Sequence, residues 1–158
     1  MEHPKDIGDL STLEIMRALR ARGYHLLVPF GENTRYDLVI DDGVNLARIQ
    51  CKTGRLRGGV IEFATASTYG HHPNPKIQRR NYIGEIDFFA VFCRETRAVY
   101  LIPIGDVQTR AAASLRIAPP RNNQRRRIRY AVDYEIGAVE ARSIPEPGAR
   151  AGGSGSSA

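Results

Sequence analysis

The stretch that decides the fold is Tyr36-Asp37-Leu38-Val39-Ile40, followed by Asp41-Asp42-Gly43 and the run from Val44 to Lys52, VNLARIQCK. The two runs at 36–40 and 45–52 are rich in Val, Ile, Leu and Tyr, as β-strands are. The Asp-Asp-Gly between them is a turn signal of the kind that joins two antiparallel strands. We therefore predict a β-hairpin over this stretch.

The side chains of this hairpin sort by chemistry. A two-residue loop at Asp42-Gly43 would place Asp37 opposite Arg48, and side chains alternate between the two faces of a strand. One face then carries polar residues and the other apolar ones; the two sets are Asp37, Arg48, Gln50 and Lys52, against Leu38, Ile40, Ala47, Ile49 and Cys51. A turn longer by one residue would exchange the faces of one strand, and the separation favours the register chosen here. Oxygen ligands beside an ammonium suit Mg²⁺-assisted cleavage of a phosphodiester.

Glu14 is a further candidate, on a helix predicted from about Asp9 to Arg22. Its neighbours one turn away, Leu10 and Ala18, are apolar, so we expect Glu14 to face the core or a sheet and to need a metal or a cation there. Two structural interpretations compete with this one. Ser11 and Glu14 fit a capping box, and Arg17 can pair with Glu14 at i+3.

These residues resemble a known family. The helix with Glu14, then Pro29-Phe30-Gly31, Tyr36-Asp37-Leu38 and the run from Arg48 to Gly54, is similar to the PD-(D/E)XK nuclease superfamily, in particular its group I intron-associated homing endonucleases. The resemblance covers most of residues 5–136. It implies an α/β fold with a restriction-endonuclease-like core, in which helices flank a mixed sheet of four to five strands.

The resemblance also implies roles for individual residues. The catalytic set would be Glu14, Asp37, Gln50 and Lys52, with Lys52 orienting or activating the attacking water and stabilising charge on the phosphate. Glu14, Asp37, Gln50 and the carbonyl of Cys51 would hold Mg²⁺, for which Mn²⁺ would substitute, while the Cys51 thiol belongs to the core. Gln50 departs from the Asp or Glu in the superfamily's name, although the homing branch is similar in carrying Gln-x-Lys. A neutral ligand predicts weak metal binding without DNA, and leaves open a catalytically inactive protein that only binds DNA.

The charge distribution suggests a polyanionic partner. The chain has 158 residues and a net charge of +6, much of it in residues 121–129, which hold five Arg and no acidic residue. Arg grips phosphate and reads guanine, while Asn and Gln read adenine. The alternative is a solvated basic loop. We predict contacts with double-stranded DNA by Arg55, Arg57, Lys76, Arg79, Arg80, Arg121, Asn122, Asn123, Gln124, Arg125, Arg126 and Arg127.

Outside the hairpin, strands are predicted at 24–28, 60–65, 86–93 and 97–102, and a short helix from Asp106 to Ala113. Residues 66–83 form a long polar segment expected to line the DNA groove, and Asp87 is assigned a structural or supporting role. The nuclease-like domain is predicted at 1–136, and residues 137–158, rich in Gly and Ser, form a tail expected to be disordered. No signal peptide or membrane-spanning run is visible, and two Cys without zinc spacing fit reduced thiols in the cytoplasm.

The sequence thus favours a metal-dependent DNA endonuclease of the homing or restriction type. A Holliday-junction-resolvase-like nuclease is the near alternative, and it would cut branched DNA without sequence preference. A DNA-binding protein of the same fold without activity is the alternative from another class, while RNA binding would leave the placement of Asp37, Gln50 and Lys52 unexplained. Cutting two strands usually requires more than one active site, so we expect a homodimer or homotetramer.

Overall fold

The computed structural model describes residues 2–69, 78–107, 111–118, 128–136 and 144. Its elements are α1 (Pro4–Ala21), β1 (His25–Leu27), β2 (Leu38–Asp41), β3 (Leu46–Arg57), β4 (Val60–Ala64), β5 (Ala66–Tyr69), β6 (Gln78–Asn81), β7 (Phe88–Cys93), β8 (Ala98–Pro103) and β9 (Ala112–Arg116), with 3-10 turns at Ile104–Asp106 and Ala131–Asp133. The strands predicted at 24–28, 60–65, 86–93 and 97–102 are confirmed as β1, β4, β7 and β8.

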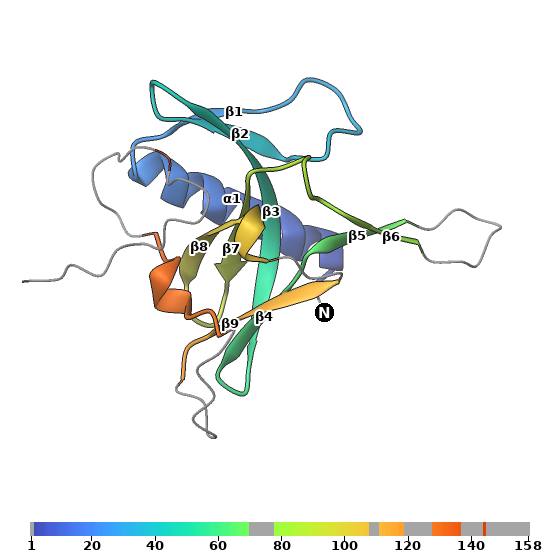
Figure 1. Ribbon diagram of the computed structural model, residues 1–158, viewed down its shortest axis with the longest axis vertical. Coiled ribbons are helices and arrows are strands. Elements are labelled where there is room, and N and C mark those ends of the chain that lie inside the picture. The colour runs from blue at the N-terminus through green and yellow to red at the C-terminus, as the bar shows by residue number, and fades with distance from the viewer. Residues whose placement is uncertain (1, 70–77, 108–110, 119–127, 137–143, 145–158) are drawn as a thin grey trace, which may run out of the picture.

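Strand β3 organises the sheet. Its first residues pair antiparallel with β2, its middle pairs parallel with β7, and its end pairs antiparallel with β4. With β1, β8 and β9 added at the edges, the sheet has seven strands. It is mixed, as the α/β prediction requires, but larger than the four to five strands expected. Strands β5 and β6 form a separate two-stranded ribbon that projects from the body (Figure 1).

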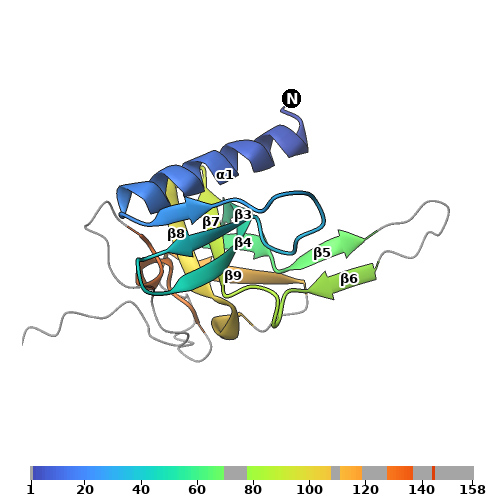
Figure 2. The same ribbon diagram turned by 90° about the horizontal axis from the view of Figure 1, so that it is seen from above.

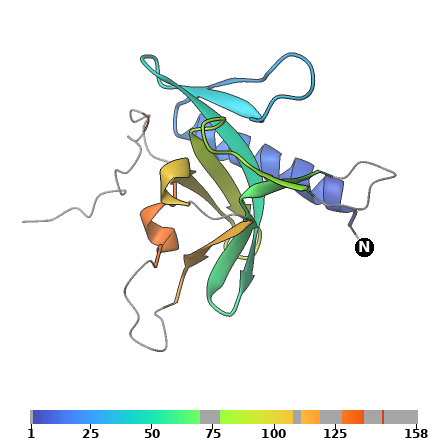
Figure 3. The same cartoon turned by 45° about the vertical axis from the view of Figure 1, so that its right-hand side comes forward.

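Helix α1 covers one face of the sheet and lies across β3 and β7 (Figure 2). Its buried residues are Ser11, Ile15 and Leu19, spaced by one turn, and they pack on the apolar face of the hairpin. The other face carries a second core, in which Ile61, Phe89 and Tyr82 are buried. The 3-10 turn at Ala131–Asp133 lies on the side of the molecule away from the ribbon (Figure 3).

The predicted helix from Asp106 to Ala113 is wrong. The chain makes a 3-10 turn at Ile104–Asp106 and then, from Ala112, strand β9, which pairs with β4. In β9 the alternate residues Ala113 and Leu115 are buried, so a sheet partner far along the chain overrides local helix propensity. Within the described residues α1 is the one α-helix, and no helix there is long and apolar enough to cross a membrane.

Candidate active site

The predicted hairpin is present, with its register displaced by two residues. Val39, not Asp37, lies opposite Arg48, and Asp41 lies opposite Leu46. The loop therefore has four residues, because Asp42 accepts hydrogen bonds from the amides of Val44 and Asn45 and so builds a longer turn. A shift of two residues leaves every side chain on its predicted face.

Asp37 lies just before β2 and is held against the middle of β3. Its Oδ2 accepts a 2.8 Å hydrogen bond from the amide of Cys51, and its own amide donates 2.8 Å to the carbonyl of Ile49. By its accessible surface Asp37 is an exposed residue, although protein encloses part of its carboxyl group. This enclosure raises the pKa of Asp37, while the Cys51 amide and the charge of Lys52 act in the opposite direction. A nearby cation would therefore stabilise the ionised form of the Asp37 carboxylate.

Gln50 and Lys52 flank Cys51 on β3 and project to the face away from α1. On this face Gln50 lies beside Phe89 and Lys52 beside Val91 of the parallel strand β7. The Lys52 ammonium donates a 3.2 Å hydrogen bond to the hydroxyl of Tyr82. Asp37 shares this face, because its neighbour Leu38 is buried under the helix. The hairpin thus gathers a carboxylate, an amide and an ammonium.

The Cys51 thiol lies in the core, as predicted, and the backbone amide of Cys51 lies beside Asp37. Its amide contacts Asp37, whereas its thiol is buried on the helix side, near the hydroxyl of Thr12. Burial, together with the nearby charge of Asp37, raises the pKa of the Cys51 thiol to about 12. The thiol is a core group, and the backbone is the part of Cys51 that faces the site.

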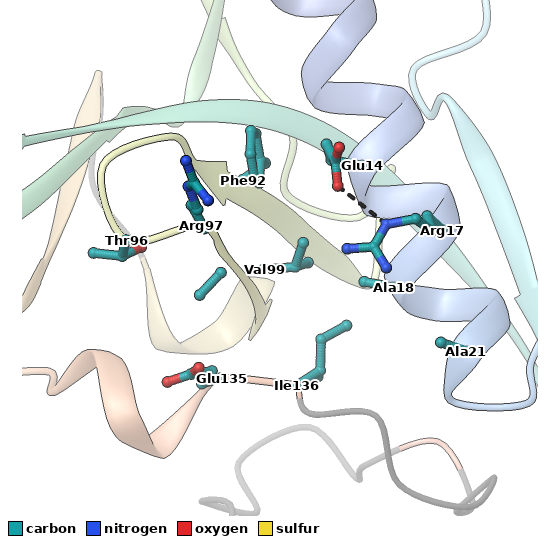
Figure 4. Close-up of a pocket in the computed structure, with 11 residues that line it drawn as sticks. Glu14, Arg17, Ala18, Ala21, Phe92, Thr96, Arg97, Val99, Glu135 and Ile136 are labelled. Atoms are coloured by element: carbon teal, nitrogen blue, oxygen red, sulfur yellow. Dashed lines mark hydrogen bonds and ion pairs between the residues drawn. The ribbon is translucent and has the colours of Figure 1, made fainter.

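The structure does not bring Glu14 to this site. Its carboxylate pairs with Arg17 at 3.2 Å and remains 43% exposed, beside a cavity of about 170 Å³ that Phe92 and Arg97 also line (Figure 4). Thr12, which contacts Cys51, is two residues away and so about 200° around the helix axis. The expected burial of Glu14 is wrong because the buried stripe runs one residue out of phase with it.

Of the two structural interpretations of Glu14, one holds and one does not. The i+3 pair with Arg17 is present. The capping box is absent because the helix begins at Pro4, with His3 as its N-cap, and this puts Ser11 in mid-helix. There Ser11 is buried and its hydroxyl lies 2.6 Å from that of Thr53 on β3.

Asp87 has the structural role assigned to it. Its carboxylate accepts hydrogen bonds from the amide of Arg48 at 2.7 Å and from the Arg48 guanidinium at 3.2 Å. Burial disfavours the charge of Asp87, but these hydrogen bonds outweigh it and lower the pKa of Asp87. Because the Asp87 amide also donates to the Arg48 carbonyl, the pair fixes the start of β7 against β3.

The predicted DNA contacts are spread over the molecule. Arg55 and Arg57 are exposed, but alternation along β3 places them on the side of Thr53, opposite Lys52. Arg80 lies in the ribbon, is 66% exposed and pairs with Glu85. For Arg79 the structure describes the backbone in β6. Lys76 and the segment Arg121, Asn122, Asn123, Gln124, Arg125, Arg126 and Arg127 lie outside the described residues.

Two residues of this region, Tyr82 and Arg35, were not anticipated from the sequence. Tyr82 contacts Lys52, and the Arg35 guanidinium stacks on the Tyr82 ring with its carbon 4.1 Å from the ring centroid. Neither residue lies in a motif or a periodic pattern. They are recognised only in the structure, where a buried ring contacts two cations from distant segments.

The donor set suits a divalent cation only in part. Among the described residues no three His, Cys, Asp or Glu side chains converge on one point. Asp37 Oδ1 and the Gln50 amide, however, make no hydrogen bond to any described residue, so both oxygens are available as ligands beside the Cys51 backbone. Carboxylate, amide and carbonyl oxygens are the ligands that Mg²⁺ prefers. The residues therefore fit such an ion, with fewer negative charges than a carboxylate cluster would supply.

Comparison with known proteins agrees with this geometry. A model of the PD-(D/E)XK endonuclease family matches residues 2–137. The solved structure of a bacterial homing endonuclease, I-Ssp6803I, is 26% identical and superposes with a TM-score of 0.65, over 85% of this chain and 89% of that one. No curated protein sequence matches the chain. The family match spans the helix, the hairpin and every strand of the sheet, and on this basis the chain belongs to the PD-(D/E)XK endonucleases.

Proposed function

We propose that this endonuclease is a Mg²⁺-dependent DNA endonuclease of the homing or restriction type. The observation that carries the proposal is the 2.8 Å hydrogen bond from the Cys51 amide to Asp37. It fixes a carboxylate against the strand whose neighbouring side chains, Gln50 and Lys52, project to the same face. Nucleases of this family generally use divalent metal ions, and the structural neighbour is a homing endonuclease.

In this proposal Asp37 and Gln50 supply the oxygen ligands, with the Cys51 carbonyl beside them. The chemistry supplied by Mg²⁺ in such a site, when bound, is polarisation of the scissile phosphate and activation of water. Lys52 orients the attacking water and stabilises charge that develops on the phosphate. Glu14 has no part in it, because the helix holds its carboxylate on the other side.

The β5–β6 ribbon supports DNA as the substrate. It leaves the body close to the Lys52 face of β3, because Tyr82 directly follows β6 and contacts Lys52 (Figure 1). A two-stranded antiparallel ribbon fits the width of the major groove. We infer that the ribbon, with Arg79 and Arg80, tracks the groove while the Asp37 site reaches the phosphate backbone. Two such sites in a homodimer or homotetramer would cut both strands.

A second candidate function is DNA binding without cleavage. The observation that favours it is the charge of the site, because among the described residues no three His, Cys, Asp or Glu side chains converge on one point. Asp37 would then be the main negative charge beside Gln50 and Lys52. A site with one carboxylate holds a divalent ion weakly. Such a protein would bind DNA with a steep dependence on salt and leave it intact.

The test is cleavage of supercoiled plasmid and of a four-way junction by the purified protein, in Mg²⁺, Mn²⁺ or EDTA. The plasmids carry a library of random inserts, and cut ends are captured and sequenced so that cleavage of a rare cognate sequence is detected. We expect metal-dependent nicking or linearisation that the Asp37→Ala variant loses while it still binds DNA. Preference for the junction would point to the resolvase-like alternative. Tight binding with no product from any substrate would establish the non-cleaving protein instead.

A further inference from the structure

The ring of Tyr82 contacts two cations that come from different parts of the chain. Tyr82 is only 4% exposed and makes an edge contact with Phe89, with ring centroids 5.6 Å apart. The Lys52 ammonium is 4.8 Å from the Tyr82 centroid and donates to its hydroxyl. The guanidinium carbon of Arg35 is 4.1 Å from the same centroid. A buried ring whose position is fixed by packing thus sets the position of the lysine head group.

Arg35 in turn binds the base of the β5–β6 ribbon on both strands. Its guanidinium donates 2.8 Å to the hydroxyl of Ser67 in β5, and 2.7 Å to the carbonyl of Asn81 in β6. It also forms an ion pair with Glu85, a residue that Arg80 of the ribbon contacts as well. One side chain therefore touches both strands of the ribbon and the ring that holds Lys52.

We propose that Tyr82 is a positioning residue that holds the Lys52 ammonium beside Asp37, and that Arg35 makes this position depend on the seating of the β5–β6 ribbon. The inference rests on the proposed nuclease function. A lysine side chain loses rotamer entropy when it is fixed, and the contact with Tyr82 fixes Lys52 before any substrate arrives. Because the Tyr82 hydroxyl takes one of the three ammonium N–H groups, the other two remain oriented for water and phosphate.

The contacts of Arg35 also connect the ribbon to Lys52 through the Tyr82 ring. DNA that seats the ribbon would press on Ser67 and Asn81, and both are hydrogen-bonded to Arg35. Because Arg35 stacks on the ring that accepts the Lys52 hydrogen bond, a ribbon that leaves its seat would loosen this contact, and a seated ribbon would keep Lys52 in place. Binding and cleavage would then be linked through one ring.

The first experiment compares Tyr82→Phe with Tyr100→Phe. Both substitutions remove a hydroxyl from a buried ring of the same core. Tyr100 is a suitable control because its hydroxyl donates to Thr96 at 3.0 Å, away from Lys52. We expect Tyr82→Phe to lower the single-turnover cleavage rate about 10- to 100-fold with unchanged DNA affinity, because a displaced catalytic group costs that much. Tyr100→Phe should cleave within about twofold of the parent, since it leaves the site untouched. Equal rates for parent and Tyr82→Phe would overturn the proposal.

The second experiment needs no cleavage and keeps the inference separate from the nuclease function. The chain has three lysines, Lys5, Lys52 and Lys76, so their side-chain Cε groups give few NMR signals. Lys52 should be more ordered than the exposed Lys5, and Tyr82→Phe or Arg35→Gln should lower its order parameter, whereas Arg94→Gln, which breaks a surface pair with Glu2, should not. A parent that orders Lys52 but never cleaves would contradict the nuclease function alone. A Lys52 as mobile as Lys5 in the parent would overturn the positioning role.

Discussion

Oδ2 of Asp37 accepts the amide proton of Cys51 across 2.8 Å, so a side chain takes a place beside β3 where a neighbouring strand would ordinarily supply a carbonyl. This bond fixes the Asp37 carboxylate beside Cys51 and close enough to feel the charge of Lys52, and it leaves Oδ1 without a hydrogen bond to any described residue. The site is thus built on strand backbone, and its charge is set by few side chains. Several measurable properties depend on that charge.

Replacing Gln50 by Glu should strengthen metal binding. The change adds a second negative charge next to Asp37 with nearly the same shape, and ligand charge sets the affinity of an oxygen site for a hard cation. We expect the Mg²⁺ concentration at half-maximal cleavage to fall about tenfold, the change that 1.4 kcal/mol of binding free energy produces. Titration of cleavage with Mg²⁺, and calorimetry with Mn²⁺, measure it. The matched control Gln50→Leu should raise the requirement, and an unchanged midpoint in Gln50→Glu would mean that this position does not face the ion.

Glu14→Ala should leave cleavage unchanged within about twofold, because the variant keeps every group near the reacting phosphate. The side chain is 43% exposed and pairs with Arg17, itself 75% exposed, and surface pairs of this kind contribute at most about 1 kcal/mol. Plasmid cleavage and thermal unfolding check both parts, with Arg17→Ala as the control. Loss of cleavage in Glu14→Ala but not in Arg17→Ala would return Glu14 to the active site.

Asp37→Asn should stabilise the fold slightly at neutral pH while it removes activity. Enclosure raises the pKa of Asp37, so the folded state binds its proton more tightly than the unfolded state does. The stability that this proton confers is present below the unfolded pKa and is lost as the pH rises through the folded pKa. At pH 7 the ionised carboxylate therefore opposes folding, and Asn does not, although exposure limits the gain to less than about 1 kcal/mol.

Denaturant unfolding of the parent and of Asp37→Asn from pH 3 to pH 8 tests this dependence. The gain from Asn should appear as the pH rises above the ordinary range for Asp and vanish below it. A gain that is the same at all pH values would show that the charge of Asp37 is not its cause.

Asp87→Asn should show the opposite dependence on pH. Hydrogen bonds from Arg48 lower the pKa of Asp87, so the folded state favours its ionised form. That stability is present above the unfolded pKa and is lost as the pH falls through the folded pKa. We expect the variant to be less stable than the parent at pH 7 and equal to it at the acid end of the same titration. A stability difference that grows toward acid pH would contradict the assignment.

Gly54→Ala should destabilise the protein by about 1–3 kcal/mol, the usual cost of an extra methyl in a packed core. A Cβ at residue 54 would lie 2.7 Å from Cγ2 of Ile61 and 2.8 Å from Cγ1 of Val91, and both neighbours are buried. The matched control is Gly8→Ala, at a helix position with open space around its Cβ, which should raise stability by up to about 1 kcal/mol. Urea denaturation measures both changes, and a neutral Gly54→Ala would mean that β4 and β7 can move apart.

The sequence predicted the faces of the hairpin because alternation is a local property. It missed the register by two residues, since the turn built by Asp42 depends on its hydrogen bonds rather than on the Asp-Gly pair. It misplaced Glu14 because the apolar neighbours Leu10 and Ala18 do not mark the buried stripe, and Leu10 is 48% exposed. The partners of Lys52 could not be found by pattern, because they meet only when residues 35, 52 and 82 come together.

The long strand β3 pairs with one strand that is close to it along the chain, β2, and with one that is distant, β7. Its pairing with β2 closes over a four-residue loop, whereas its parallel pairing with β7 brings together Ile49 and Phe88 across the intervening ribbon. Contacts between residues distant along the chain tend to form late, because closing the long loop between them costs entropy before the contact stabilises the fold. We therefore expect the hairpin that carries Gln50 and Lys52 to form before it pairs with β7. The site would then be steadied only after the ribbon and β7 have been synthesised and the sheet is complete.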